Sequence, residues 1–328
     1  GYKALMTSSC TNALEIIALS LDLEEGDEVV MPSFNFVGVA NSFVLAGANI
    51  VFADIDPLTM NISPASIKRV IGPKTKAIVV MHYAGIACDL DAILEICKEN
   101  NLTLIEDNAQ GIHCSYKGQL LGSFGDYSCI SFDSMKNVSC GEGGVLLFKE
   151  SQINKVVEIF NVGTNKIAFE KGFVEKYEWI CKGSKYALSE YSAAILQPLL
   201  EISEEICSLR REKWDYLFNG FFSNPKIDHL LPTKLKSAEH KGHVFFIKCK
   251  NMEERDLLIT SMREDGITCA FHFSALHSSP YALKYDLKME SDVHTTVESD
   301  KLLRLPIYSN IEFEDLDAIL AAIENYYR

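Results

Sequence analysis

Short apolar runs alternate with helix-periodic segments over roughly the first 150 residues of the chain. The runs are rich in β-branched residues, which is typical of strands buried in a mostly parallel sheet. The predicted strands are Glu28–Met31, Asn49–Ala53, Ala77–Met81, Leu102–Ile105, Tyr127–Phe132 and Val145–Phe148. The predicted helices are Thr11–Leu21, Asn35–Leu45, Ser63–Val70 and Asp89–Glu99. This alternation predicts an α/β architecture, with a large mixed or mostly parallel sheet flanked by helices.

The pattern changes near Ser189, where one or two long helices are predicted up to about Phe222. The elements predicted beyond them are strand Val244–Cys249, helix Met252–Glu264, strand Thr268–Phe273 and a helix from Glu312 onward. We therefore expect a large α/β domain over residues 1–205 and a smaller α+β domain over residues 206–328, joined through the long helix.

Charge and cysteine usage narrow the class of protein. The net charge of −14 argues against nucleic-acid or anionic-membrane partners that depend on overall basicity. None of the ten cysteines forms a C-x-x-C pair, so we expect reduced thiols in a cytoplasmic protein rather than a zinc ribbon. We expect no membrane span and no signal peptide. Because the chain begins at Gly1, only a few residues before a predicted helix, we also expect a segment to precede it.

The block from Ser131 to Gly144 carries the strongest chemical signal. It places Lys136 just beyond a predicted strand and follows it with a glycine-rich turn into the next strand. A lysine in a partly desolvated pocket can form a Schiff base with an aldehyde, and the Ser131 hydroxyl is a candidate phosphate ligand. Together they suit pyridoxal phosphate (PLP), although most lysines are simply solvated surface groups.

Further polar groups follow predicted strands, and the carboxyl ends of strands are where ligands gather in open α/β sheets. The segment 8–12 either binds a phosphate through free helix N–H groups or only caps the helix. Asp107 is a candidate partner for a protonated pyridine nitrogen, and Gln110 for the phenolic oxygen of the ring. Phe36 either stacks on a flat ring or packs in the core.

Three histidines have open assignments. His82 follows a predicted strand and either lines the pocket or is a satisfied structural histidine. His272 and His277 are five residues apart, without a further ligand at suitable spacing, so we expect polar contacts to a sugar or phosphate and no metal site.

These segments, in this order, resemble the DegT/DnrJ-type family of PLP-dependent nucleotide-sugar aminotransferases. The matching blocks are Ser9–Glu15, Gly26–Phe34, Glu106–Gly111, Tyr116–Gly118, Gly122–Asp126, Ser131–Gly144 and Leu303–Pro306. One branch, the dTDP-4-amino-4,6-dideoxygalactose transaminases, is the most similar. Its matching blocks are His82–Gly85, Gly163–Asn165, Lys176–Trp179, Gly183–Tyr186 and Phe271–His277.

The resemblance implies the aspartate-aminotransferase (fold-type I) architecture and a homodimer with active sites shared between subunits. It implies that Lys136 forms the Schiff base and shuttles the proton, and that Asp107 pairs with the pyridine nitrogen. The other implied cofactor contacts are Gln110, Phe36, Ser131, Ser9, Cys10 and Thr11. The implied substrate contacts are His82, Lys185, His272 and His277. In many relatives the partner subunit supplies an asparagine at the block that holds Ser184 and Lys185 here.

The implied reaction transfers an amino group from an amino acid, which by analogy with the family is L-glutamate, to a nucleotide-linked 4-keto-6-deoxy sugar. Four alternatives stay open. A 3-amino sugar aminotransferase belongs to the same family, and a 3-dehydratase on this scaffold replaces the lysine with histidine. A catalytically silent or regulatory homologue would not need Lys136. A nicotinamide dehydrogenase would need a G-x-G-x-x-G motif, which the segment 141–144 does not match.

Overall fold

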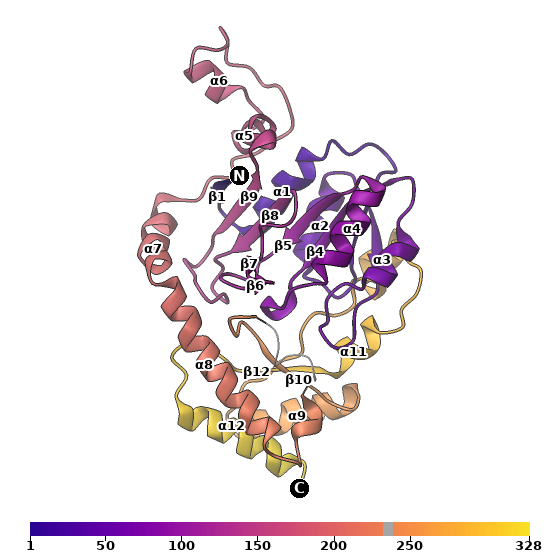
Figure 1. The fold of residues 1–328 in the computed structure, drawn as a ribbon, viewed down its shortest axis with the longest axis vertical. Helices are drawn as coiled ribbons and strands as arrows, with labels where there is room; N and C mark the ends of the chain where they lie inside the picture. The colour runs from indigo at the N-terminus through magenta and orange to yellow at the C-terminus, as the bar shows by residue number, and fades with distance from the viewer. Residues whose placement is uncertain (232–238) are drawn as a thin grey trace.

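The computed structural model describes residues 1–231 and 239–328, and an eight-stranded sheet forms its centre (Figure 1). The order across the sheet is β1-β9-β8-β5-β4-β2-β3-β11. These strands are β1 (Tyr2–Thr7), β2 (Glu28–Pro32), β3 (Asn49–Ala53), β4 (Thr75–Met81), β5 (Thr103–Asp107), β8 (Tyr127–Ser131), β9 (Gly144–Lys149) and β11 (Lys288–Met289). The six strands from β8 to β11 are mutually parallel, whereas β9 runs antiparallel to both β8 and β1. The predicted mixed, mostly parallel sheet is confirmed.

Helices cover both faces of the sheet, as its two-sided burial requires. On one face, α1 (Cys10–Ser20), α2 (Val37–Leu45) and α5 (Ile153–Phe160) bury their apolar sides with β2, β5 and β8. On the other face, α3 (Pro64–Val70) and α4 (Leu90–Asn100) pack over β3, β4 and β5. The predicted cap of α3 is present, because Ser63 accepts from the N–H of Ser66 and Pro64 opens the helix.

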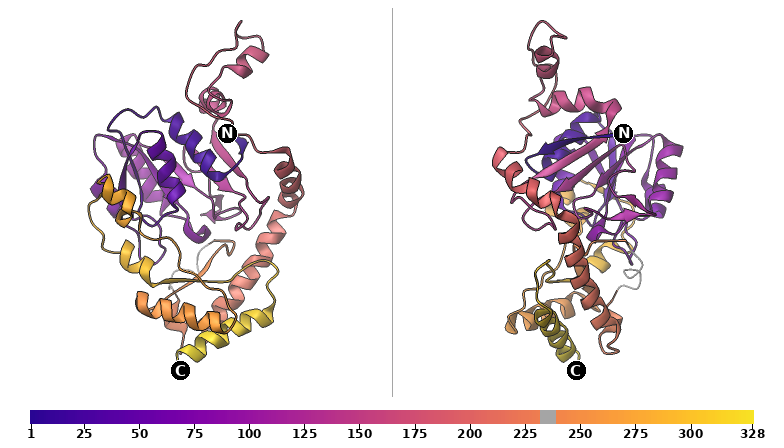
Figure 2. Two further views of the ribbon diagram at one scale, coloured as in Figure 1. Left: turned by 180° about the vertical axis from the view of Figure 1, so that it is seen from behind. Right: turned by 60° about the vertical axis from the view of Figure 1, so that its left-hand side comes forward.

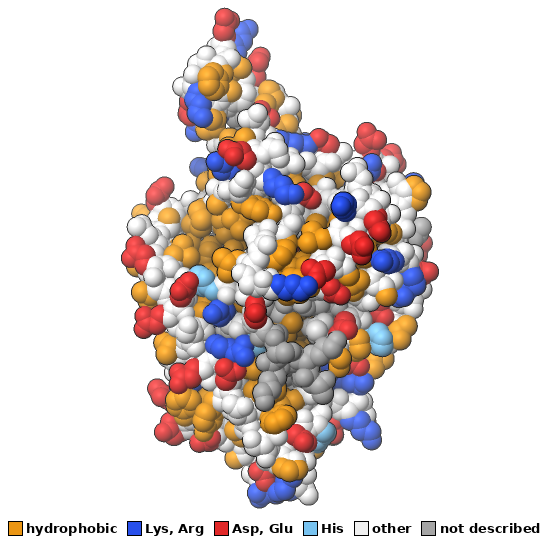
Figure 3. Space-filling model, viewed as in Figure 1, with side chains coloured by type: hydrophobic (Ala, Val, Ile, Leu, Met, Phe, Trp, Pro, Cys, Tyr) orange, Lys and Arg blue, Asp and Glu red, His pale blue; other side chains and the backbone are white. Residues whose placement is uncertain are grey.

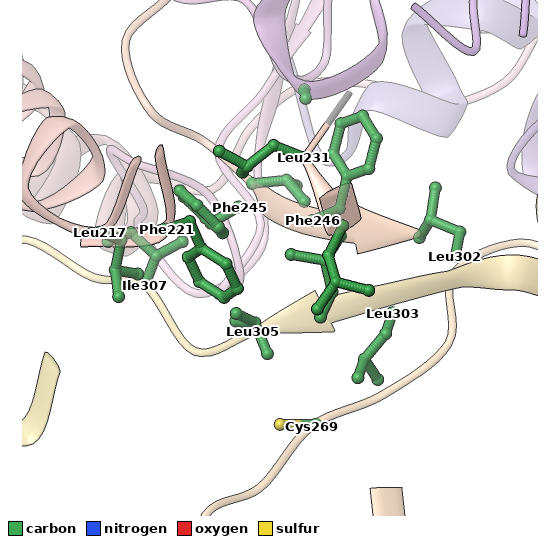
Figure 4. Close-up of a cluster of buried hydrophobic side chains, with 14 of the residues drawn as sticks. Leu217, Phe221, Leu231, Phe245, Phe246, Cys269, Leu302, Leu303, Leu305 and Ile307 are labelled. Carbon is green, nitrogen blue, oxygen red and sulfur yellow. The ribbon is translucent and has the colours of Figure 1, made fainter. Parts of the chain in front are cut away.

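The second part of the chain packs helices against a two-stranded sheet. This sheet pairs β10 (Phe245–Lys248) with β12 (Leu302–Leu305), antiparallel. The helices of this region are α7 (Glu190–Glu201), α8 (Ser203–Phe222), α9 (Met252–Glu264), α10 (Pro280–Lys284), α11 (Thr295–Lys301) and α12 (Phe313–Tyr326). Of these, α8, α9 and α12 share an apolar cluster with β10 and β12. Figure 4 shows buried side chains of α8, β10 and β12 that belong to one apolar cluster, among them Phe221, Phe245 and Leu305. That cluster extends to Phe34 and Tyr83 of the first part, so the two parts share packed surface.

We propose the division into domains 1–205 and 206–328. Its boundary falls in the first turn of α8, and the second range contributes β11 to the edge of the large sheet by parallel pairing with β3.

Three features differ from the sequence-based expectation. The predicted strand over residues 268–273 is wrong, because only Ala270 of that segment forms a bridge, with Arg304. The true partner of β10 is β12, which the periodicity did not indicate. The antiparallel strand β1 was also missed.

Residues 161–185 project from the body of the molecule (Figure 2). The bridges Asn161–Lys185 and Thr164–Trp179 close this projecting segment at its base, and it contains α6 (Lys166–Glu170). The remaining short strands, β6 (Ser115–Tyr116) and β7 (Gln119–Leu120), form a small hairpin. Within the described ranges no helix is long and apolar enough to cross a membrane.

Candidate active site

A cavity of about 1140 Å³ lies at the carboxyl ends of the parallel strands. Asp107 ends β5, Ser131 ends β8 and Met81 ends β4, and all three line it. Residues of the second part, including His272 and Arg304, close the other side. The topology therefore assembles one site from both parts of the chain, in the place where open α/β sheets bind ligands.

Asp107 and Glu106 are neighbours in β5 and face opposite sides of the sheet, because side chains alternate along a strand. Glu106 is buried and accepts hydrogen bonds from the N–H groups of Gly122 (2.9 Å), Phe124 (2.8 Å) and Gly125 (2.7 Å). Asp107 lines the cavity instead. Glu106 thus orders a loop, and Asp107 is the carboxylate available to a ligand.

Asp107 lacks a full set of donors. It is 3% exposed, and its Oδ1 accepts from the N–H of Ala109 at 3.0 Å and from the Cys129 thiol at 3.8 Å. Its Oδ2 has no hydrogen-bond partner in the described part of the chain. Burial raises the pKa of the Asp107 carboxyl, and the Ala109 N–H and the charge of Lys136 oppose the shift. A protonated ring nitrogen would supply the missing partner.

Lys136 lies in the loop that follows β8 and is half-buried in the cavity wall. The loop is held by the Lys136 N–H, which donates to the carbonyl of Asp133 at 2.9 Å. The Lys136 charge acts on Asp107, so the amine and the carboxylate serve the same cavity.

The next residue, Asn137, connects the Lys136 loop to the second part of the chain. Its Nδ2 donates to the carbonyl of Lys241 at 3.2 Å, so its Oδ1 is the acceptor for His243 Nδ1, at 2.8 Å. His243 must therefore carry its proton on Nδ1, which leaves Nε2 as an acceptor. Burial, and then the charge of Lys136, lower the pKa of His243 well below its ordinary value and keep the ring neutral. We infer that this contact positions the lysine loop.

The N-terminus of α1 forms a second wall. Ser9 caps the helix by accepting from the N–H of Asn12 at 3.0 Å, and no acidic residue occupies the first turn. The N–H groups of Cys10 and Thr11 have no acceptor among the described residues and lie in the cavity lining, so they can bind an anion.

Gly144 brings this helix end and Ser131 together. It pairs with Ser131 in the sheet, and a Cβ built on it would lie 2.5 Å from the backbone nitrogen of Cys10. Any side chain at position 144 would displace the start of α1. Because Ser131 also lines the cavity, we propose that its hydroxyl and the helix N–H groups form a composite phosphate site.

Phe36 and Gln110 both line the cavity, and we propose them as contacts to the cofactor ring. Phe36 is 50% exposed at the cavity, which corrects the alternative that it packs in the core. A Cβ at Gly38 would lie 2.5 Å from the Phe36 ring, so that glycine makes room for the aromatic side chain. Gln110 Oε1 accepts from the N–H of Ala84 at 2.7 Å, which leaves Nε2 available as a donor.

The predicted pocket role of His82 is wrong. His82 is completely buried outside the lining of the cavity. Its Nδ1 accepts from the N–H of Cys88 at 3.2 Å, and its Nε2 donates to Glu106 at 3.0 Å. Both nitrogens are used, so His82 supports the strand that carries Asp107.

Of the other predicted substrate contacts, only His272 lines the cavity. His277 binds Ser33 Oγ through Nδ1 (2.7 Å) and Asp292 through Nε2 (3.2 Å), and it lies outside the lining. Lys185 is exposed at the base of the projecting segment, also away from this cavity. Within one subunit, therefore, neither His277 nor Lys185 reaches the site.

Sequence reasoning missed two arginines and one histidine of the cavity, Arg210, Arg304 and His243. Arg304 was visible as part of the family-like block Leu303–Pro306, but no chemistry was assigned to it. Arg210 lies within a long helix, where nothing in the local pattern separates it from a surface residue.

Cys10, Asp107 and Cys129 bring donor atoms within 4.8 Å of one another, a distance that would suit a metal ion. The interaction with Cys10 and burial raise the pKa of the Cys129 thiol well above its ordinary value. Cys10 and Asp107 of this cluster line the cavity, so we assign the cluster to the cavity wall.

The residues present fit PLP. The cavity offers an amine for the aldehyde (Lys136), a carboxylate short of donors for the ring nitrogen (Asp107), an exposed aromatic face (Phe36) and a helix N-terminus with Ser131 for the phosphate. We propose these residues, together with Ser9 and Gln110, as the cofactor site.

The comparisons with known proteins agree with this chemistry. Residues 2–324 match the model of the DegT/DnrJ/EryC1/StrS aminotransferase family. The spore coat polysaccharide biosynthesis protein SpsC of Bacillus subtilis (strain 168) is 28% identical over 331 aligned positions, which cover 98% of this chain and 85% of SpsC.

Solved structures agree in fold. The aminotransferase TlmJ from Streptoalloteichus hindustanus is 27% identical, with a TM-score of 0.88, covering 98% of this chain and 85% of TlmJ. The PLP form of the sugar aminotransferase Spr1654 from Streptococcus pneumoniae is 23% identical, with a TM-score of 0.87 over 99% of this chain and 87% of that one. The predicted fold-type I architecture is confirmed, and the aminotransferases of the matched family are PLP-dependent. This chain belongs to the DegT/DnrJ/EryC1/StrS aminotransferase family.

Proposed function

We propose that this enzyme transfers the amino group of L-glutamate to carbon 4 of a nucleotide-linked 4-keto-6-deoxy sugar, giving a 4-amino-4,6-dideoxy sugar nucleotide. The observation that carries the proposal is the meeting of Lys136, Asp107 and the open N-terminus of α1 in one cavity. The blocks shared with the dideoxygalactose transaminase branch support amination at position 4.

The chain's own residues divide the chemistry among them. PLP, when bound, supplies the electron sink. Lys136 Nζ would take the proton from Cα of the amino donor as general base and deliver it to the C4′ carbon of the cofactor as general acid. Asp107 holds a negative charge opposite the ring nitrogen, and Phe36 and the α1 N-terminus fix the ring plane and the phosphate.

We propose that the enzyme acts in polysaccharide biosynthesis. The support is the likeness to SpsC, whose name places that relative in the making of spore coat polysaccharide. A nucleotide sugar and an amino acid are the substrates expected of the family.

A second copy of this chain is the proposed partner. The projecting segment 161–185 carries exposed apolar side chains, and Phe173 is 78% and Trp179 81% exposed. Hydrophobic side chains also gather on the body of the molecule below this segment (Figure 3). Exposed aromatic surface of this kind is typical of interfaces. We propose that the segment lies against the other subunit, where Lys185 would approach the second active site.

The substrate can be identified directly. The purified PLP form is incubated with L-glutamate and, separately, with dTDP- and UDP-linked 4-keto-6-deoxy and 3-keto-6-deoxy sugars, and the products are identified by NMR. We expect an amine at carbon 4. Amination at carbon 3 would assign the enzyme to the 3-amino sugar group, and the absence of any aminated sugar would contradict the proposal.

A further inference from the structure

Arg304 lines the cavity and has no counter-ion in the part of the chain that the structure describes. It is the third residue of β12, between the buried Leu303 and Leu305, and its side chain lines the cavity. Its backbone is fixed on both sides, because it faces Phe246 across the β10–β12 pair and exchanges hydrogen bonds with Ala270 (2.8 and 3.3 Å). The guanidinium is therefore presented from a rigid strand.

That guanidinium has no polar partner in residues 1–231 and 239–328. No side-chain hydrogen bond or ion pair of Arg304 is present there, and its Nε is buried and unbonded. Arg304 is half-buried, and this burial lowers the pKa of its guanidinium. A desolvated cation is costly unless an anion is bound to it.

Arg210 provides an internal comparison, since it lines the same cavity. Its Nε donates to the carbonyl of Gly242 at 2.9 Å and its Nη2 to the carbonyl of His243 at 2.8 Å. The Arg210 guanidinium is therefore hydrogen-bonded to the backbone, whereas the N–H donors of Arg304 are available to a ligand in the cavity.

The surroundings of Arg304 supply no negative charge. Tyr83 OH and His272 Nδ1 bond to each other at 2.8 Å. Burial, followed by the charges of Arg304 and Lys136, lowers the pKa of His272, so that ring stays neutral. None of the acidic residues that line the cavity forms an ion pair with Arg304, and these residues are Asp107, Asp133 and Glu142. The missing anion must come with a ligand.

We propose that Arg304 binds a carboxylate of the amino donor, an assignment that rests on the proposed aminotransferase function. The planar fork of an arginine matches the two oxygens of a carboxylate. Arg304 and Lys136 line the same cavity, so one ligand in that cavity can contact both cations. The α-carboxylate of an amino acid is one bond from the Cα that Lys136 serves. The diphosphate of a nucleotide sugar is separated from carbon 4 by the sugar ring.

The test measures binding of glutarate, a dicarboxylate that cannot be transaminated, to the PLP form by isothermal titration calorimetry. We expect Arg304→Gln to bind glutarate about ten- to a hundredfold more weakly, the range for losing a charged hydrogen-bond donor. Arg304→Lys keeps the charge but lacks the planar fork, so its glutarate affinity should lie between those of the wild type and Arg304→Gln. Arg263→Gln removes an exposed arginine of α9 and should match the wild type. Glutaramide, which has no charge, should show no difference between wild type and Arg304→Gln.

The same variants, titrated with dTDP and UDP, distinguish the two sources of an anion. If Arg304→Gln weakens nucleotide binding and leaves glutarate unchanged, Arg304 serves the sugar nucleotide and the proposal is overturned. It is also overturned if the wild type does not bind glutarate, or if all variants bind it equally. Should Arg304→Gln not fold, Arg304→Lys carries the comparison. Because glutarate binding needs no sugar, a wild type that binds glutarate through Arg304 but aminates no keto sugar would refute the proposed function alone.

Discussion

At the scale of single residues, the site depends on which of two adjacent acidic residues of β5 faces the cavity. Glu106 and Asp107 are chemically alike, yet Glu106 accepts three backbone N–H bonds and Asp107 has an unbonded oxygen at the cavity. The sequence could identify the pair because it follows a predicted strand. The sequence could not show that His82 hydrogen-bonds Glu106, because that contact joins positions 24 residues apart and depends on strand pairing.

Asp107→Asn should preserve the fold and PLP binding and slow catalysis. The amide keeps the shape but removes the negative charge opposite the ring nitrogen, so we expect the glutamate half-reaction to slow by about a hundredfold or more, as for loss of a preorganised charge. Stopped-flow absorbance of the bound cofactor measures this rate. A rate within twofold of wild type would remove Asp107 from its proposed role.

His243 should make stability depend on pH. The lowered pKa keeps His243 neutral when folded, whereas the unfolded chain binds a proton below about pH 6.5. The stabilisation is therefore present above pH 6.5 and is lost as the pH falls. His243→Asn keeps a donor near the Nδ1 position without titrating. Between pH 7.5 and 5.5 the wild type should lose about 1.4 kcal/mol more unfolding free energy than this variant. Urea unfolding at both pH values tests this, and equal losses would contradict the neutral assignment.

At the scale of elements, the buried parallel strands were predictable because each is a short β-branched run bounded by turn residues. The antiparallel strand β1 and the pairing of β10 with β12 were not. β1 has exposed positions and its hydrogen bonds go to β9, more than 130 residues away. The segment 268–273 has apolar residues but only one bridging position, so tertiary contacts overrode its local pattern.

Gly144→Ala tests the close backbone contact between β9 and the N-terminus of α1. The added Cβ would lie 2.5 Å from the backbone nitrogen of Cys10 and would push the helix N-terminus out of place. We expect PLP affinity to fall by at least about tenfold, the effect of losing one or more charged phosphate contacts. Fluorescence titration of the cofactor-free protein with PLP gives the affinity. Gly72→Ala is the matched control, since nothing lies within 4 Å of its Cβ. Equal PLP affinity in both variants would show that the α1 N-terminus does not hold the phosphate.

At the scale of the whole molecule, the cavity is closed by residues from distant parts of the chain, including His243, His272 and Arg304. The Asn137–His243 hydrogen bond joins positions 106 residues apart, and Arg304 comes from still farther along the chain. Periodicity and motif spacing are local, so they could predict Lys136 and Asp107 but not the residues that face them. The resemblance to a family narrowed the chemistry, and the packing of the two parts determines the rest.

Phe173→Glu should weaken self-association. Phe173 is 78% exposed on the projecting segment, and a charge placed in an apolar interface is strongly unfavourable. We expect sedimentation velocity to show a shift from dimer towards monomer, together with reduced activity, because the active sites are proposed to be shared. Leu283→Glu, at a 71% exposed position of α10, is the control and should stay dimeric. A wild type that sediments as a monomer would contradict the proposed partner.

The central claim is that Lys136 is the residue to which the cofactor attaches, and borohydride reduction followed by peptide mass spectrometry tests it most directly. The account predicts that reduction of the PLP form fixes one phosphopyridoxyl group on the peptide that contains Lys136. Lys136→Ala should remain folded and acquire no such group. A label on a different lysine, with Lys136 unmodified, would contradict the account.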